Sequence, residues 1–359
     1  MIEIDVNYPG GNVIVQRREG NTFYLAPDLR DTNTWWFYYN FCVRGGAGKK
    51  IKFVFERHAC SPYGPGISYD GENWAYYPER ITGNEFSFEY EFKENENAVW
   101  FSWSLPYQLK RFKEKFGCST VFEWTEICKT EKGRSVPLLK GGKGEKIICF
   151  SCRHHCCESV AEYVLEGVLK EIENNERLRE QYTFYVLPFV DLDGVEDGDQ
   201  GKNRAPHDHN RDYGENTKQI YNTTGAWTSL LKNLDFCAGV DIHDPWLWYG
   251  VNAHTSFVFN AKGEKGLERL SKILENITEK SALRHESEWD MVFGRDWNTE
   301  SNANGASAKD FYKRCGADIA CSLEIPYFPT FKATVDDFVA FGKDLAKALD
   351  LYFTGVKND

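Results

Sequence analysis

Two histidines and an acid lie close together in the segment CFSCRHHCCES, which runs from Cys149 to Ser159. His155 and Glu158 form an H-x-x-E pair in a predicted turn between a buried strand and a helix. An imidazole and a carboxylate in such a turn can face one open space and bind a metal ion. His154 competes for the same role, but its wider spacing from Glu158 favours His155. Alone, the motif fits a solvated turn histidine equally well.

The cysteines of this segment raise two other interpretations. Cys149-x-x-Cys152 matches half of a thiolate zinc site, but residues three apart on a strand point to opposite faces. The sequence contains no second Cys-x-x-Cys pair that would complete four ligands. A redox pair would instead stand at the start of a helix. We therefore interpret the cysteines as bystanders to chemistry carried by the histidines.

Further residues able to do chemistry lie at the ends of other predicted strands. His243 ends the strand DFCAGVDIH, and Glu324 is a lone acid in the apolar strand IACSLEIPY. A charged group in an apolar strand is costly to bury unless it is paired or functional. A polar, glycine-rich loop after the strand TFYVLPFV supplies two arginines and an asparagine. Ligands of α/β sheets bind at the carboxyl ends of strands, so we expect these groups to meet there. The residues expected at this edge are His155, Glu158, Arg204, Asn210, Arg211, His243 and Glu324.

The elements that must position these residues change character along the chain. Up to Pro106, alternating segments such as EFSFEYEFK and AVWFSWSLP, separated by Gly and Asn turns, predict an antiparallel β-sandwich. After the predicted helix YQLKRFKEKFG, strands alternate with helices, which is typical of an α/β domain. Ser159 and Glu162 fit a capping box and predict the start of the clearest helix. We therefore expect a β-sandwich domain at 1–107 and an α/β domain at 108–359.

Composition and charge narrow the partners and the compartment. The chain has 43 basic and 54 acidic residues, a net charge of −11, and lacks a long basic cluster, which disfavours nucleic acid and anionic membranes as partners. No apolar run approaches the length of about 20 residues that spans a bilayer. The first residues, MIEIDVNYPGG, do not match a secretory signal, and the 11 cysteines are an odd number. We therefore expect reduced thiols and a cytoplasmic location.

In combination, the motifs resemble those of the M14 family of zinc metallocarboxypeptidases, the carboxypeptidase A-like enzymes. The resemblance rests on the H-x-x-E pair, the distant strand-end His243, the HNR that contains Asn210 and Arg211, and the acid in SLEIPY. The upstream β domain and the segments LPYQLKRF and CKTEKGRSVPLL make the chain most similar to the cytosolic carboxypeptidase subgroup. The resemblance covers nearly the whole chain. It implies a mixed-sheet α/β catalytic domain behind the sandwich, and hydrolysis of the C-terminal peptide bond of a peptide or protein.

The resemblance also implies one zinc ion per chain, held by His155, Glu158 and His243. Two imidazoles, one carboxylate and one water form the open four-coordinate site of a zinc hydrolase. By the same resemblance, Glu324 is the carboxylate that accepts the proton of the attacking water. Asp208 corresponds to the acid that accepts a hydrogen bond from a ligating imidazole, so we expect it beside His155.

Four further residues correspond to groups of the family that contact the substrate. Arg204 corresponds to the arginine that stabilises the charge on the attacked carbonyl, although its spacing to Asn210 is shorter than in the digestive enzymes. Arg211 offers a planar fork for the terminal carboxylate of a peptide, and Asn210 can donate a further hydrogen bond. Alignment of AKDF with the specificity pocket places Lys309 where it would favour an acidic C-terminal residue. The alternative for Lys309 is a solvated surface lysine.

One expected residue is missing, and two other functions remain open. The position of the lid tyrosine of the digestive enzymes falls at Asn302, within TESNANGAS, where no tyrosine stands. Another group must therefore take its role. A related deacylase or amidase, or a carboxypeptidase of peptidoglycan stem peptides, would use the same residues. A catalytically inactive peptide-binding protein is the alternative of another class, and the presence of all three ligands and Glu324 argues against it.

Overall fold

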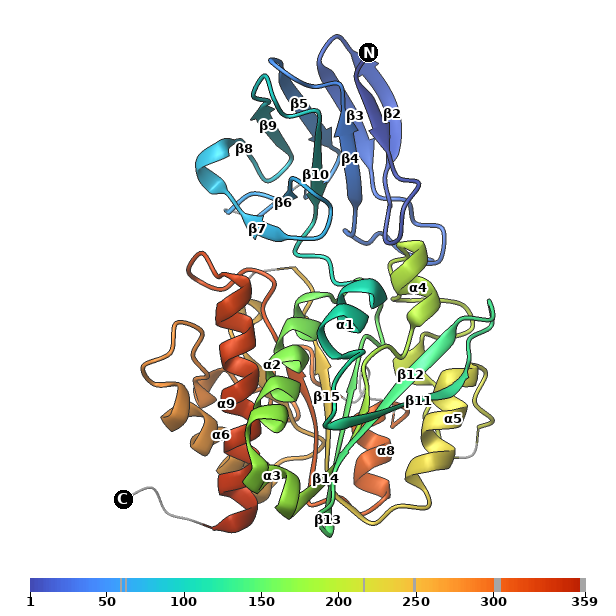
Figure 1. Cartoon of the computed structure of the whole chain (residues 1–359), viewed down its shortest axis with the longest axis vertical. Coiled ribbons are helices and arrows are strands. Elements are labelled where there is room, and N and C mark those ends of the chain that lie inside the picture. Colours follow the sequence, from blue (N-terminus) through green and yellow to red (C-terminus); the bar gives the residue numbers. More distant parts are fainter. Residues whose placement is uncertain (59, 62, 216, 248–249, 300–304, 356–359) are drawn as a thin grey trace.

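The computed structural model describes residues 1–359 except 59, 62, 216, 248–249, 300–304 and 356–359. The chain forms a β-rich part, from β1 to β10, followed by a larger α/β part, from α1 to α9 (Figure 1). The β-rich part sits above the α/β part in this view, with α1 and α4 close to the junction. Among the described residues, no helix is long and apolar enough to cross a bilayer.

The β-rich part consists of two five-stranded sheets. Its strands pair in antiparallel fashion, as the sequence predicted, except that β3 and β5 pair in parallel among the described strands. The first sheet has the order β1 (Glu3–Asp5), β4 (Asn40–Arg44), β10 (Ala98–Ser102), β6 (Gly66–Ser68), β7 (Trp74–Tyr76). The second has the order β2 (Ile14–Glu19), β3 (Thr22–Ala26), β5 (Lys50–Phe55), β9 (Ser87–Glu91), β8 (Ile81–Asn84). A 3-10 turn, η1 (Pro78–Arg80), precedes β8.

Aromatic side chains fill the space between the two sheets. The ring of Phe53 on β5 lies 5.3 Å from that of Phe41 on β4 and 5.3 Å from that of Phe101 on β10. The predicted alternation along EFSFEYEFK holds for the buried Phe88, but Phe86 is 44% exposed. Phe86 precedes β9, in a turn where its N–H donates to Asn84, so it does not share the inward face of the strand.

The α/β part is built on a seven-stranded mixed sheet. The four central strands are parallel, and antiparallel strands flank them on both edges. The order is β11 (Phe122–Lys129), β12 (Ser135–Gly142), β14 (Tyr182–Leu187), β13 (Lys146–Cys152), β15 (Phe236–His243), β17 (Ile319–Glu324), β16 (Ser256–Val258). The carboxyl ends of the parallel strands form one edge of the sheet, as the site requires.

Helices cover both faces of this sheet. In Figure 1, α2, α9 and α6 lie on one side, and α5 and α8 lie on the other. The helices are α1 (Leu109–Phe116), α2 (Val160–Asn174), α3 (Glu176–Gln181), α4 (Leu192–Asp197), α5 (Asn222–Leu231), α6 (Lys265–Thr278), α8 (Ala308–Arg314) and α9 (Val335–Thr354), with 3-10 turns η2 (His209–Arg211), η3 (Gly250–Ala253) and η4 (Ser287–Trp289). Gly167 of α2 and Gly342 of α9 let these helices approach closely, because a Cβ at either position would collide with backbone of the other helix.

The start of α2 differs from the prediction. Ser159 occupies the N-cap position but its side chain makes no capping hydrogen bond, so the predicted capping box with Glu162 is wrong. Instead, Asp244, which follows β15, accepts a hydrogen bond of 2.8 Å from the N–H of Val160. A carboxylate from a neighbouring strand end therefore satisfies this helix terminus, which the local sequence could not reveal.

Candidate active site

The residues predicted to bind metal converge at the carboxyl edge of the sheet. His155 and Glu158 lie between β13 and α2, and His243 is the last residue of β15. The Nδ1 atoms of both imidazoles face the carboxylate of Glu158, each at 2.7 Å from one of its oxygens. The three side chains are buried, and one ligand atom from each lies within 4.8 Å of the others. Each residue therefore offers an atom to one shared position.

This donor set fits a zinc ion. A tetrahedral zinc with bonds of about 2 Å keeps its ligand atoms roughly 3.3 Å apart, a separation that small side-chain rotations reach from the observed arrangement. Burial by itself raises the pKa of Glu158, but the charges and hydrogen bonds of His155 and His243 lower it below its ordinary value. The carboxylate is therefore ionised, as a metal ligand must be. The metal would be held by His155, Glu158 and His243.

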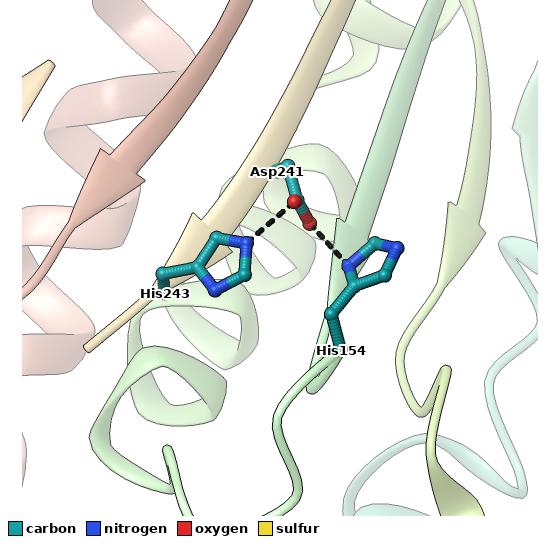
Figure 2. A group of neighbouring side chains, drawn as sticks. All are labelled: His154, Asp241 and His243. Carbon is teal, nitrogen blue, oxygen red and sulfur yellow. Dashed lines mark hydrogen bonds and ion pairs between the residues drawn. The ribbon is translucent and has the colours of Figure 1, made fainter. Parts of the chain in front are cut away.

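A second group of His and Asp side chains adjoins this one and shares His243. Figure 2 shows Asp241 between the imidazoles of His243 and His154. Asp241 lies 2.5 Å from Nε2 of His243 and 2.7 Å from Nδ1 of His154, while the other nitrogen of His154 lies 2.6 Å from the hydroxyl of Tyr213. His154, Asp241 and His243 are themselves close enough to hold a metal ion. Both nitrogens of His154 face protein groups, however, which favours His155 as the candidate ligand. Asp241 accepts from the nitrogen of His243 that points away from Glu158, which fixes the orientation of the ring.

Asp208 lies beside His155, the other candidate imidazole ligand. Its carboxylate is 3.6 Å from Nε2 of His155 and accepts a hydrogen bond from the N–H of Asn210. Burial raises the pKa of Asp208, but the hydrogen bond and charge of His155 outweigh it, and the net pKa lies below the ordinary value. Both imidazoles therefore have an ionised acid behind them.

Glu324 is the last residue of β17 and pairs in register with His243 on the neighbouring strand. Its side chain is buried but borders the same cavity as the candidate ligands. Burial raises the pKa of Glu324 to about 7, and the charge of Glu158 acts in the same direction while that of His243 opposes it. A carboxylate with a raised pKa beside a metal position is suited to accept and return a proton near neutral pH.

The cavity that joins these groups has a volume of about 530 Å³ and receives residues from both parts of the chain. Trp36 of the β-rich part lines it together with residues of the α/β part. The candidate substrate-binding residues Arg204, Asn210, Arg211 and Lys309 line it as well. These groups gather around one space that can hold the end of a peptide.

Asn210 and Arg211 form part of η2 and are tied into the surrounding structure. The amide nitrogen of Asn210 lies 3.2 Å from Nε2 of His243, and its amide oxygen accepts a hydrogen bond of 2.9 Å from the N–H of Ala308. One guanidinium nitrogen of Arg211 donates to the carbonyl oxygen of Asn210 at 3.0 Å. Asn210 therefore links a candidate ligand to the first turn of α8, the helix that carries Lys309.

Arg204 has surroundings that the sequence did not predict. Its three guanidinium nitrogens lie 2.9 Å from Asp31, 2.6 Å from Asp191 and 3.0 Å from Asp199. Three carboxylates thus engage a side chain that was expected to face the attacked carbonyl. The role of Arg204 in stabilising the reaction stays a prediction, and its observed contacts are those of a residue that holds the loop together.

Two residues near the candidate ligands escaped the sequence analysis, Lys202 at the cavity and the fully buried Asp241. The amine of Lys202 lies 3.3 Å from Nε2 of His155. No motif in the sequence pointed to this lysine. Asp241 stands two residues before His243 on a strand, so the two share one face, and this spacing was a usable signal. Asn302, the position of the missing lid tyrosine, lies outside the described residues.

Comparisons with known proteins agree with the geometry. The zinc carboxypeptidase family matches residues 109–304, and the cytosolic carboxypeptidase N-terminal domain matches residues 4–103. An uncharacterised protein of Zymomonas mobilis is 24% identical over 61% of this chain and 61% of its own length. Cytosolic carboxypeptidase 1 of Homo sapiens is 24% identical over 41% of this chain, and the match spans only 14% of its length. The matched region therefore spans less than two thirds of the length of each of these relatives.

Solved structures share the fold over the whole chain. A metallo-carboxypeptidase from Burkholderia cenocepacia superposes with a TM-score of 0.79 at 18% identity, covering 99% of both chains. A metallo-carboxypeptidase from Pseudomonas aeruginosa has a TM-score of 0.77 at 19% identity, covering 99% of this chain and 100% of the other. At such identities the likeness shows the fold alone. The family match spans more than half of the chain, and the protein therefore belongs to the zinc carboxypeptidase family.

Proposed function

We propose that this protein is a zinc-dependent carboxypeptidase that removes the C-terminal residue of a peptide or protein. The observation that carries the proposal is the convergence of His155, Glu158 and His243 with the buried carboxylate of Glu324 at one edge of the cavity. Arg211 supplies a cation to the same cavity for the carboxylate that ends a peptide. The names of the cytosolic carboxypeptidase relatives support a cytoplasmic location as part of the proposal.

The proposed reaction divides the work among these side chains. When bound, zinc lowers the pKa of a water molecule and polarises the peptide carbonyl. Glu324 accepts the proton of that water as its oxygen attacks the carbonyl carbon, and then passes the proton to the leaving amine. Arg211 holds the terminal carboxylate of the substrate through its planar fork, with Asn210 beside it. Asp208 and Asp241 hold the two imidazoles in the tautomers that keep Nδ1 available.

A preference for acidic C-terminal residues forms the finer part of the proposal. Lys309 borders the cavity with only 6% of its surface exposed, and its amine donates to the amide oxygen of Asn260 at 3.1 Å. The charge of Arg211 acts on Lys309, so two cations face the same region. A C-terminal glutamate or aspartate carries two carboxylates and can use both cations, whereas a neutral residue uses only one.

The experiment that tests the carboxypeptidase combines elemental analysis with peptide hydrolysis. We expect about one zinc per chain in the parent and in Glu324→Gln, and loss of zinc in His155→Ala. We expect Glu324→Gln to lose about 10²–10⁴-fold in kcat, because the amide keeps the shape of the side chain but cannot accept a proton.

Two variants serve as controls for this experiment. Cys156→Ser tests the thiolate alternative and is expected to keep its zinc. Glu123→Gln changes an exposed acid of β11 and is expected to keep its activity. Zinc that disappears with Cys156→Ser but stays with His155→Ala would refute the ligand set. A parent that releases amino acids from acylated amino acids but not from peptides would identify a deacylase instead.

A further inference from the structure

The loop that brings Arg204 to the cavity lies against segment 31–34 of the β-rich part. The N–H of Asn33 donates to the carbonyl oxygen of Asn203 at 3.2 Å. In return, the side-chain amide of Asn203 donates to the hydroxyl of Thr34 at 2.8 Å. These contacts join positions that are far apart in the chain. The β-rich part therefore supports one wall of the cavity from behind.

Asp31 makes three of the contacts between this segment and the loop. One of its carboxylate oxygens accepts from the N–H of Gln200 at 2.8 Å. The other accepts from the N–H of Gly201 at 2.8 Å and from Nε of Arg204 at 2.9 Å. An ionised carboxylate has only acceptors, so it can serve three donors without a mismatch. The side chains of Asp31 and Arg204 are only 10% and 12% exposed, so one buried group fixes both the loop backbone and the plane of the guanidinium.

The guanidinium of Arg204 keeps donors that a substrate can use. Its two terminal nitrogens lie 2.6 Å from Asp191 and 3.0 Å from Asp199, and each of them carries two hydrogens. Their other contacts are longer, at 3.3 Å from Nδ1 of His209 and 3.9 Å from the thiol of Cys156. Arg204 borders the cavity, so an oxygen of the substrate can replace these weaker partners while the carboxylates keep the group in place.

We propose that Asp31 of the β-rich part is a positioning residue for catalysis, which holds the guanidinium of Arg204 towards the attacked carbonyl oxygen. The inference rests on the proposed carboxypeptidase reaction and on the predicted role of Arg204. Asp31 acts through Arg204 and does not touch the substrate. A cation that is already fixed needs no reorganisation as the oxygen becomes negative, whereas a guanidinium free to turn has to be ordered first. The β-rich part thereby contributes to the rate of the reaction as well as to stability.

The first test compares two variants of Asp31 with the parent. Asp31→Asn keeps the size of the side chain, but its NH2 group faces other donors, so the guanidinium loses its fixed orientation. We expect kcat to fall about tenfold to a hundredfold, while KM stays within about threefold and zinc stays at about one per chain. Asp31→Ser leaves room for water beside the N–H groups. It should show the same loss, and it replaces Asp31→Asn if that variant does not fold.

A double variant separates positioning from a general loosening of the junction. Arg204→Met alone is expected to lower kcat about 10²–10³-fold. If Asp31 acts through Arg204, adding Asp31→Asn to this variant should lower kcat by less than about twofold further. Arg30→Ala is the matched control, because Arg30 donates across the same junction to the carbonyl oxygen of Asp197 and otherwise contacts Asp28. This control should keep the kcat of the parent.

An unchanged kcat in the Asp31 variants would overturn the proposal, and so would losses that multiply in the double variant or an equal loss in Arg30→Ala. A parent that cleaves no peptide would refute the carboxypeptidase proposal separately. Calorimetry on the zinc-loaded protein would still decide the role of Asp31, because binding is measured without turnover. The probe is a peptide phosphonate, which presents a tetrahedral anion in place of the scissile carbonyl. Asp31→Asn should weaken phosphonate binding about tenfold or more and leave the affinity for the product amino acid within about twofold, whereas unchanged phosphonate affinity would overturn the role.

Discussion

Lys309 is a basic side chain in a buried position at the border of the cavity. The amine lies 3.1 Å from Asn260 and 3.6 Å from the carboxylate of Asp310. Burial lowers the pKa of Lys309 below its ordinary value of 10.5, Arg211 lowers it further, and the acids Asp310 and Glu264 oppose the shift. A base with a lowered pKa is charged below that pKa and neutral above it.

A preference for acidic C-terminal residues should therefore fade as the pH rises. At about pH 7, with Lys309 charged, we expect a peptide ending in Glu to exceed one ending in Leu by about tenfold to a hundredfold in kcat/KM. The ratio should fall towards pH 10, earlier than an ordinary lysine would allow. Lys309→Met should remove both the preference and its pH dependence, whereas Lys313→Met, at an exposed lysine of the same helix, should keep them. A parent that prefers Leu at about pH 7 would contradict this role of Lys309.

The sequence predicted which residues would meet better than it predicted what each would touch. His155, Glu158 and His243 could be placed together because each lies at or just after a predicted strand, and parallel strands end at one edge. The surroundings of Arg204 could not be predicted, because Asp31 lies 173 residues away and belongs to the other part of the chain. Lys202 was overlooked because lysines in polar loops are ordinarily solvated.

At the scale of elements, α2 carries an acid, Glu162, for which the local sequence pattern predicted the wrong role. Glu162 was predicted to cap the helix, but it is completely buried, and neither carboxyl oxygen has a hydrogen-bond partner among the described residues apart from the weak thiol donor of Cys152. Burial raises its pKa from 4.5 to about 8, although the charge of Arg153 opposes the shift. Asp244 accepts a hydrogen bond from the N–H of Val160 in the first turn of α2, so this turn is capped without a contact to Glu162. By contrast, Thr334 and Asp337 do form a capping box at the start of α9.

This buried acid should make the protein less stable as the pH rises. Folded Glu162 keeps its proton up to about pH 8, whereas the unfolded chain loses it near 4.5, so the stability it contributes is complete below 4.5 and is lost as the pH approaches 8. Glu162→Gln removes this titration. We therefore expect the melting temperature of the variant, relative to the parent, to rise between about pH 6 and about pH 8.5. Glu145→Gln, at an exposed acid, should show no such trend, and a constant difference for Glu162→Gln would refute the assignment.

At the scale of the whole molecule, Gln200 fastens the α/β part to the β-rich part. Its buried amide oxygen accepts from the N–H of Tyr38 at 2.9 Å, and its amide nitrogen donates to the carbonyl oxygens of Tyr38 and Asp28. The hydroxyl of Tyr76 donates to the carbonyl oxygen of Tyr327 across the same junction. Buried polar contacts of this kind fix one relative placement of the two parts, because any other would leave them unpaired.

Gln200→Ala should therefore weaken the folded state as a whole. Removal of the amide leaves backbone groups of Tyr38 and Asp28 without partners, and we expect a loss of about 2–4 kcal/mol in the free energy of unfolding. Denaturant titration followed by tryptophan fluorescence should show one transition in the parent and an earlier transition in the variant. Gln16→Ala, at an exposed position on β2, should match the parent. Two separated transitions in the parent would show that the parts unfold independently.

The pair of indoles at the cavity also has a consequence for protein substrates. Trp36 comes from the β-rich part and Trp246 from the α/β part, and their ring centres lie 6.5 Å apart where both border the cavity. The two rings pack against one another and form part of the cavity wall. A chain end has to reach the candidate ligands as an extended segment, because a cavity of about 530 Å³ cannot hold a folded body. The enzyme would consequently trim an unstructured tail and stop when the folded body of its substrate meets the two rings. The length of the tail left on the substrate would then reflect the depth of the cavity.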